Sequence, residues 1–278
     1  LLQITNSIVE VSHSIFSNIK LTSFDATLGS VLRINDSTIE NSFVGCQQSG
    51  AVISISDSQE LSISNSIIKH NEAPSVVLVR KTSRVSVTTS SFSNNVSPKG
   101  CSVLDVGTVT EFNFTQSDVT DNMFGTDTFY TVCVDKANQS LVEAVSWTNN
   151  IPQDATNLIV HFYDMTGYTL LFTSSYNVVL RDLDFSGEYA PCFSSVALVE
   201  SKAAAYVTSL DPIQWNGYIA VCAEIDFHAD VTFNGRLILS RFDECPDLNI
   251  VNLNGHTMIV TDALSEQITA DNWFQTAH

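Results

Sequence analysis

The sequence predicts an all-β protein, built as a right-handed parallel β-helix in which short strands stack in coils. The first observation is a degenerate sequence motif, the repeated phrase: apolar, any, apolar, two of any kind, Ser, any, apolar, often followed three positions later by Asn. The second observation is its spacing, because successive copies begin roughly 23 to 29 residues apart, within the range of solenoid repeats. The copies begin at Val9, Leu32, Leu61, Val85 and Phe112.

Each copy reads as a strand of alternating apolar and polar residues, with its apolar residues on the buried side. A second strand usually precedes it across a small polar corner such as Ser56-Asp57-Ser58. Two or three strands per repeat, joined by bends, suit a parallel β-helix. Ser and Asn at recurring positions are expected to stack into ladders inside the corners and to satisfy backbone groups there. The preceding strands are marked by Leu2 and Ile4, Ile53 and Ile55, Val77 and Val79, and Leu104 and Val106.

An antiparallel sandwich is the main competing fold, because it also contains many short strands. It predicts Asn-Gly hairpin turns, and these occur only at Asn216-Gly217, Asn234-Gly235 and Asn254-Gly255. All three lie in the second half, so the first half argues against a sandwich.

The repeated phrase stops near residue 126, which predicts two β-helix segments, at residues 1–126 and 127–278. Ser140 with Glu143 has the spacing of a capping box, and Leu141, Ala144 and Val145 share one helical face. A short cap helix is therefore expected at 140–147, covering the first coil of the second segment. The alternative is one continuous solenoid with an irregular insert at 135–157.

Several stretches resemble the pectin-lyase-like β-helix superfamily. Residues 140–162 look like the cap helix and first coil of such domains, and residues 177–187 and 248–260 are similar to their recurrent coils. Gly50 to Ile53 and the Phe-x-x-Asn pattern near Phe16 and Phe92 resemble the repeats of chlamydial polymorphic membrane proteins. The resemblance implies architecture and not activity.

Charge is scarce and one-sided, with 12 Lys and Arg against 30 Asp and Glu, a formal net charge of −18. Such a balance disfavours nucleic acid and anionic membranes as partners. No apolar run reaches the length of a membrane span, and no signal peptide opens the chain. Since the chain begins without Met and inside a repeat, it is expected to be a mature product or part of something longer.

Cysteines and sequons favour an oxidising, extracellular or cell-surface setting. No Cys-x-x-Cys spacing occurs, which argues against a zinc site and makes the six cysteines disulfide candidates without a defined pairing. The four Asn-x-Ser/Thr sequons are candidate glycosylation sites, although Pro98 weakens the one at Asn95. The candidates are Cys46, Cys101, Cys133, Cys192, Cys222 and Cys245 for disulfides, and Asn35, Asn95, Asn113 and Asn138 for glycans.

No catalytic residue is predicted. The polygalacturonase-type motifs of this superfamily (Asn-Thr-Asp, Asp-Asp, Gly-His-Gly and Arg-x-Lys) are absent from the chain. The strongest residual site is an acidic stripe in which outward carboxylates roughly 7 Å apart face solvent, where calcium is the one cofactor to consider. Polar residues at outward strand positions are equally ordinary. The stripe comprises Asp182, Asp184, Glu224 and Asp226.

The leading hypothesis is an extracellular structural or adhesive β-helix, glycosylated and assembling end to end into a filament or surface layer. Self-assembly is expected because a coil without a cap presents unpaired strand edges. Glycans or a cell surface are the other partners considered. The alternative is a polysaccharide-active lyase or hydrolase, or a carbohydrate-binding module, that uses a groove along one face.

Overall fold

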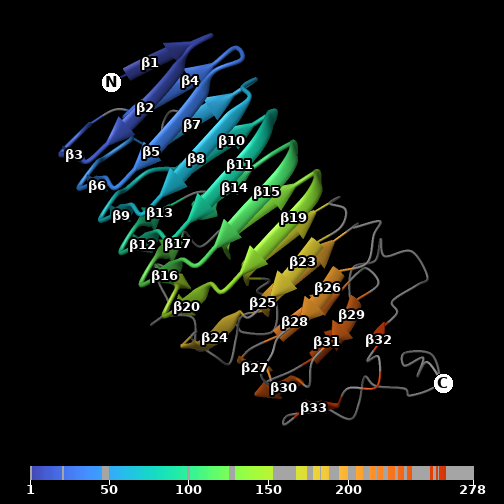
Figure 1. Ribbon diagram of the computed structural model, residues 1–278. Helices are drawn as coiled ribbons and strands as arrows, with labels where there is room; N and C mark the ends of the chain where they lie inside the picture. Colours follow the sequence, from blue (N-terminus) through green and yellow to red (C-terminus); the bar gives the residue numbers. More distant parts are fainter. Residues whose placement is uncertain are drawn as a thin grey trace.

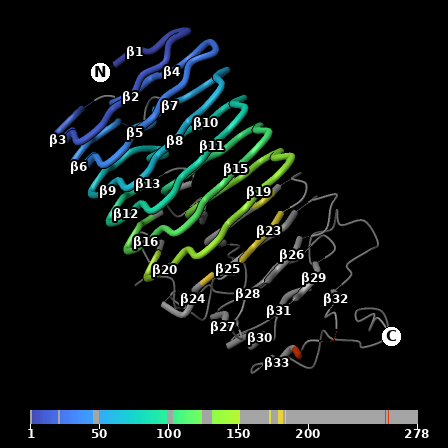
Figure 2. The backbone as a smooth tube through the Cα atoms, viewed as in Figure 1, coloured from blue at the N-terminus to red at the C-terminus, as the bar shows by residue number. Residues whose placement is uncertain are grey.

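The structure is a computed structural model that describes residues 2–20, 22–45, 50–98, 101–124 and 129–152, and beyond these the strands between residues 167 and 260 with Leu183, Gly255 and Thr257. It is a parallel β-solenoid, as the repeat predicts. The strands stack coil upon coil along one axis (Figure 1), and the described backbone between β1 (Leu2–Thr5) and β21 (Ile151–Pro152) winds as a regular spiral (Figure 2). No helix occurs among the described residues.

The strands form five parallel sheets, which we call A to E. Sheet A contains β1 (Leu2–Thr5), β4 (Phe24–Thr27), β7 (Ala51–Ser56), β10 (Ser75–Arg80), β14 (Cys101–Val106), β18 (Phe129–Asp135), β22 (Gly167–Thr173), β25 (Ser194–Val199), β28 (Tyr218–Val221) and β31 (Leu237–Leu239). Sheet B contains β2 (Ile8–Ser12), β5 (Val31–Asn35), β8 (Glu60–Ser64), β11 (Thr82–Thr88), β15 (Val109–Thr115), β19 (Ala137–Glu143), β23 (Val178–Arg181), β26 (Ala205–Thr208), β29 (Ile225–His228) and β32 (Val251–Asn252). Sheet C contains β3 (Ile15–Ser17), β6 (Thr38–Glu40), β9 (Ile67–Lys69), β12 (Ser91–Ser93), β16 (Asp118–Thr120), β20 (Ser146–Thr148) and β24 (Asp184–Gly187). Sheet D contains β13 (Val96–Ser97), β17 (Met123–Phe124) and β21 (Ile151–Pro152), and sheet E contains β27 (Ile213–Asn216), β30 (Val231–Asn234) and β33 (Met258–Val260).

The register of sheet B confirms the alignment of the repeated phrase. The first apolar residues of the copies lie opposite one another in neighbouring coils, from Val9 at the N-terminal end to Phe112. Both apolar positions of each copy point into the core and are buried, except that Val9 in the first coil is only half-buried. Aromatic rings continue the stack inside, with Phe114 in edge-to-face contact with Phe92 at 6.1 Å and with Trp147 at 5.8 Å.

Two buried ladders hold the corners on either side of sheet C, as the sequence predicts. In the first, the backbone N–H of each ladder serine donates to the Oγ of the serine in the next coil. In the second, the Oδ1 of each asparagine accepts from the backbone N–H of the asparagine one coil earlier. The residue before each ladder position has positive φ, which turns the chain. The serine ladder runs from Ser14 through Ser37, Ser66 and Ser90 to Ser117, and the asparagine ladder runs from Asn71 through Asn95 and Asn122 to Asn150.

The prediction of a cap helix at 140–147 is wrong. Ser140 and Val142 point into the core on β19, the chain turns at Ala144 (φ 52°), and Trp147 is buried on β20. This stretch is a further copy of the phrase, in which Ser140 takes an apolar position and Val145 takes the serine position. Pairing of β19 with β15 and β23 overrides the local capping signal. Sheets A and B run without interruption past residue 126. The cap helix was the argument for dividing the chain there into two β-helix segments, and that argument is lost.

The coil of β1, β2 and β3 lies at one end of the described solenoid. Its strands β1, β2 and β3 are terminal strands of sheets A, B and C, and each pairs with one described strand only. The inward side chain of Leu2 is 39 % exposed, whereas its register partner Phe24 in the next coil is 0 % exposed. Ile8 and Ile15 are 73 % and 75 % exposed. Apolar surface and unpaired backbone groups therefore coincide at this end.

Candidate functional surface

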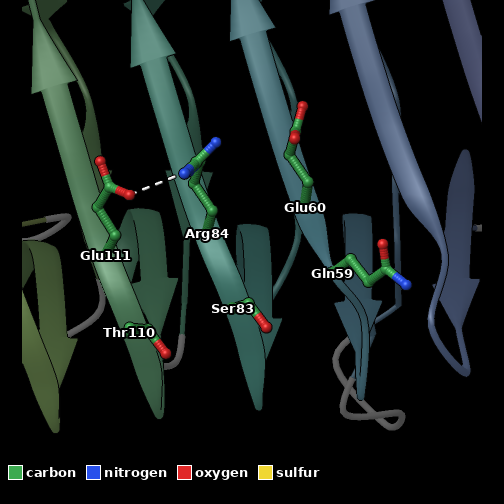
Figure 3. Close-up of a pocket in the computed structure, with 6 residues that line it drawn as sticks. All are labelled: Gln59, Glu60, Ser83, Arg84, Thr110 and Glu111. Carbon is green, nitrogen blue, oxygen red and sulfur yellow. Dashed lines mark hydrogen bonds and ion pairs between the residues drawn. The ribbon is translucent and has the colours of Figure 1, made fainter.

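A shallow pocket of about 420 Å³ lies on the outer surface of sheet B and crosses the strands β8, β11 and β15. Glu60, Arg84 and Glu111 occupy one register position in three successive coils, so their side chains form a row along the solenoid axis. A second, parallel row comes from the residues just before them. Figure 3 shows the six lining residues, which are Gln59, Glu60, Ser83, Arg84, Thr110 and Glu111.

The charges in the pocket are paired. Arg84 Nε donates to Glu111 Oε2 at 3.0 Å, as Figure 3 shows, and Asn113 Nδ2 donates to Glu111 Oε1 at 2.8 Å. These two hydrogen bonds lower the pKa of Glu111, and the bond from Asn113 is the larger cause. Glu60 accepts from Arg33 Nε at 2.8 Å, which raises the pKa of Arg33. Glu111 is therefore held ionised, and each of the two glutamates is paired with an arginine, which suits hydrogen bonding and not proton transfer.

The structure places the two described members of the predicted acidic stripe in different sheets. Asp184 lies on β24 in sheet C opposite Ser146, and Asp226 lies on β29 in sheet B. These two carboxylates are therefore not stacked on one sheet. Asp182 and Glu224 lie outside the described residues. Within the described part of the chain, no three His, Cys, Asp or Glu side chains gather as a metal site would require.

The four sequons differ in what the fold leaves accessible. Asn138 is exposed at the start of β19, and Asn35 and Asn113 are half-buried on β5 and β15. Asn95 is 0 % exposed within the asparagine ladder. Its Nδ2 donates to Ile68 O at 2.9 Å and to Asn122 Oδ1 at 2.9 Å, so both amide hydrogens are used. A glycan at Asn95 is therefore incompatible with the folded coil.

The predicted disulfide candidates fall mostly outside the described residues. Cys101 lies on β14 and Cys133, half-buried, lies on the neighbouring strand β18. Cys46, Cys192, Cys222 and Cys245 lie outside the described residues. Disulfide pairing therefore stays a prediction.

The sequence reasoning did not single out Glu60, Arg84 or Glu111. The signal was present, because each lies one position before the first apolar residue of a copy, and aligning the copies puts Glu, Arg and Glu in one column. Single-strand alternation shows only that such positions face solvent.

No family model, no curated protein and no solved structure matches this chain. The architecture therefore rests on the register, burial and ladders described above. In the described part of the chain, no helix has the length and apolar character needed to traverse a bilayer.

Proposed function

We propose that this chain is an extracellular structural or adhesive protein, which provides length, stiffness and surface and works by assembly without catalytic turnover. The observation that carries the proposal is the uninterrupted parallel stacking of ten strands in each of sheets A and B, which makes the described chain one long, stiff solenoid. Exposed strand edges are templates for pairing with another chain. A second copy of this chain is the partner we propose, and the proposed contact is coil-on-coil strand pairing of the kind seen within the chain.

The coil of β1, β2 and β3 carries groups that suit pairing with another coil. Its inward residues Leu2, Val9 and Phe16 are incompletely covered by the described residues. Ser14 occupies the serine ladder position, donates its own Oγ to Ser12 O at 2.8 Å, and leaves that oxygen as an acceptor for the N–H of a preceding coil. Head-to-tail stacking repeats the same contact at every step and does not close, so it builds a filament.

Sedimentation velocity over a range of protein concentrations, with electron microscopy of the same samples, tests this proposal. Species that grow with concentration and appear as fibres are expected. In parallel, incubation with uronate and neutral polysaccharides in the presence of calcium should release no product. A monomer at every concentration, or cleavage of any of these polysaccharides, would contradict the proposed function.

Carbohydrate binding is the second candidate function, and the pocket on sheet B favours it. Amide, hydroxyl, carboxylate and guanidinium groups line the pocket on three successive coils, and all of them can hydrogen-bond to sugar hydroxyls. A screen of immobilised glycans with the wild type and Arg84→Ala tests this candidate. Binding that is lost in the variant supports it, and the absence of binding rejects it.

The extracellular setting makes a separate prediction about chemistry. If the protein works in an oxidising compartment, most of its six cysteines should be paired. Mass analysis after thiol alkylation, with and without prior reduction, counts the free thiols. Six free thiols in protein secreted from a eukaryotic host would contradict the extracellular assignment.

A further inference from the structure

We infer that the outer surface of sheet B is the glycan-bearing face of the solenoid. This inference rests on the proposed extracellular function and says which sites and which face carry the sugar. It starts from the three sequons that the fold leaves accessible. Asn35 lies on β5, Asn113 on β15 and Asn138 on β19, and all three strands belong to sheet B.

The side chains of two of these asparagines are placed on the outer surface by strand alternation. Asn35 follows Ile34, which is 0 % exposed, and Asn113 lies between Phe112 and Phe114, which are both 0 % exposed. Asn138 is exposed at the start of β19, in the coil next to Thr110 of the pocket.

Chance placement of sequons would not favour one sheet. The described part of the chain has six other exposed asparagines, all at corners with positive φ, and none has Ser or Thr two residues later. The fourth sequon, Asn95, points into the core. Every sequon that a glycan can occupy in the folded chain therefore belongs to sheet B. The corner asparagines are Asn6, Asn18, Asn41, Asn65, Asn94 and Asn149.

The local hydrogen bonds tolerate the modification. Asn35 Nδ2 donates one bond, to Glu10 Oε1 at 3.3 Å, and Asn113 Nδ2 donates one bond, to Glu111 Oε1 at 2.8 Å. N-glycosylation forms a bond between the asparagine nitrogen and the first sugar and removes one amide hydrogen. The remaining hydrogen can keep the bond to the glutamate. At Asn95 both hydrogens are used inside the core, so no such substitution is available.

Secretion from a eukaryotic host followed by glycopeptide mapping tests the inference. We expect glycan on at least two of Asn35, Asn113 and Asn138, and an unmodified peptide at Asn95. Fewer than two occupied sites among the three, or any glycan at Asn95, would overturn it. A folded state is confirmed by circular dichroism before and after enzymatic removal of the sugar.

A matched variant separates this inference from the proposed function. Ser91→Asn creates the sequon Asn-Phe-Ser on β12, at an outward position of sheet C, and should add one further glycan on a different face. Sedimentation of the deglycosylated wild type decides whether the chain assembles, whatever the glycan map shows. Failure of the glycan map with assembly intact refutes only the face assignment.

Discussion

Replacing Asn95 by alanine removes the centre of the asparagine ladder. The side chain takes part in four buried hydrogen bonds. Its Oδ1 accepts from Asn71 N at 3.1 Å and Asn71 Nδ2 at 3.0 Å, and its Nδ2 donates to Ile68 O and Asn122 Oδ1, both at 2.9 Å. The loss of the bonds to Asn71 Nδ2, Ile68 O and Asn122 Oδ1 costs about 1 kcal/mol each, because these groups keep another bond or are carbonyl groups within a strand. The buried backbone N–H of Asn71 loses its acceptor, which costs about 1–3 kcal/mol. The free energy of unfolding should therefore fall by about 4–6 kcal/mol.

Equilibrium urea unfolding, followed by circular dichroism and tryptophan fluorescence, measures this loss. Asn113→Ala is the matched control, because Asn113 is half-buried on the outer surface and makes one hydrogen bond, to Glu111. The control should cost under about 1 kcal/mol. Equal losses in the two variants, or an Asn95→Ala loss within about 1 kcal/mol of the wild type, would refute the ladder as a main source of stability.

Three smaller predictions concern single side chains. The Oγ of Ser140 is buried without a hydrogen-bond partner in the described structure, so Ser140→Ala should raise the free energy of unfolding by about 1 kcal/mol in urea titrations; a loss would show that the hydroxyl is satisfied. The pKa of Glu111 is lowered by Asn113 and then by Arg84, so the contribution of Glu111 to stability is complete above the ordinary glutamate pKa and disappears as pH falls through the lowered value. The difference in free energy of unfolding between wild type and Glu111→Gln should therefore shrink over that interval. A constant difference would contradict the assignment. A Cβ at Gly107 would stand 2.9 Å from a side-chain carbon of the neighbouring coil and 3.2 Å from a carbonyl oxygen, so Gly107→Ala should cost about 1–3 kcal/mol in thermal or urea unfolding, and a neutral result would mean that the coil adjusts freely.

The fold was predictable because its signal is periodic. Inward pairs such as Leu61 with Ile63 and Val85 with Val87 repeat the same alternation, and parallel stacking then puts them in register. The two ladders were predictable for a related reason. A small polar residue at one fixed position of each copy has a neighbour of the same kind one coil away.

The cap helix was predicted wrongly because the copy at 140–147 departs from the repeated phrase at two key positions. A serine stands where the phrase needs an apolar residue, at Ser140, and a valine stands at the serine position, Val145. Locally this leaves a capping box and a helical face. The distance of 28 residues from Phe112 to Ser140, which are register partners, was the signal that could have identified the copy.

The candidate surface was less predictable than the fold. Alternation along one strand says that Glu60, Arg84 and Glu111 face solvent, but their interaction depends on which coil lies next to which. The acidic stripe depended on alternation in the same way. Asp182 was aligned with Asp184, and Glu224 with Asp226, along single strands, whereas the structure places Asp184 and Asp226 in different sheets.

The edge of the first coil offers the most direct test of assembly. The hydrogen bonds from Val31 N to Ser7 O and from His13 N to Asn35 O set which residues of β2 bond to β5. By the even spacing of a parallel ladder, the N–H of Glu10 lies on the open side of β2. Glu10→Pro removes that donor while the bonds to β5 remain, and Glu10→Ala controls for the lost carboxylate.

Sedimentation velocity of these three proteins, at matched concentration and with circular dichroism unchanged, therefore tests whether the chain works by stacking coil upon coil. The wild type and Glu10→Ala should form species that grow with concentration, and Glu10→Pro should remain monomeric. A wild type that is monomeric throughout, or a proline variant that assembles as the wild type does, would contradict the account.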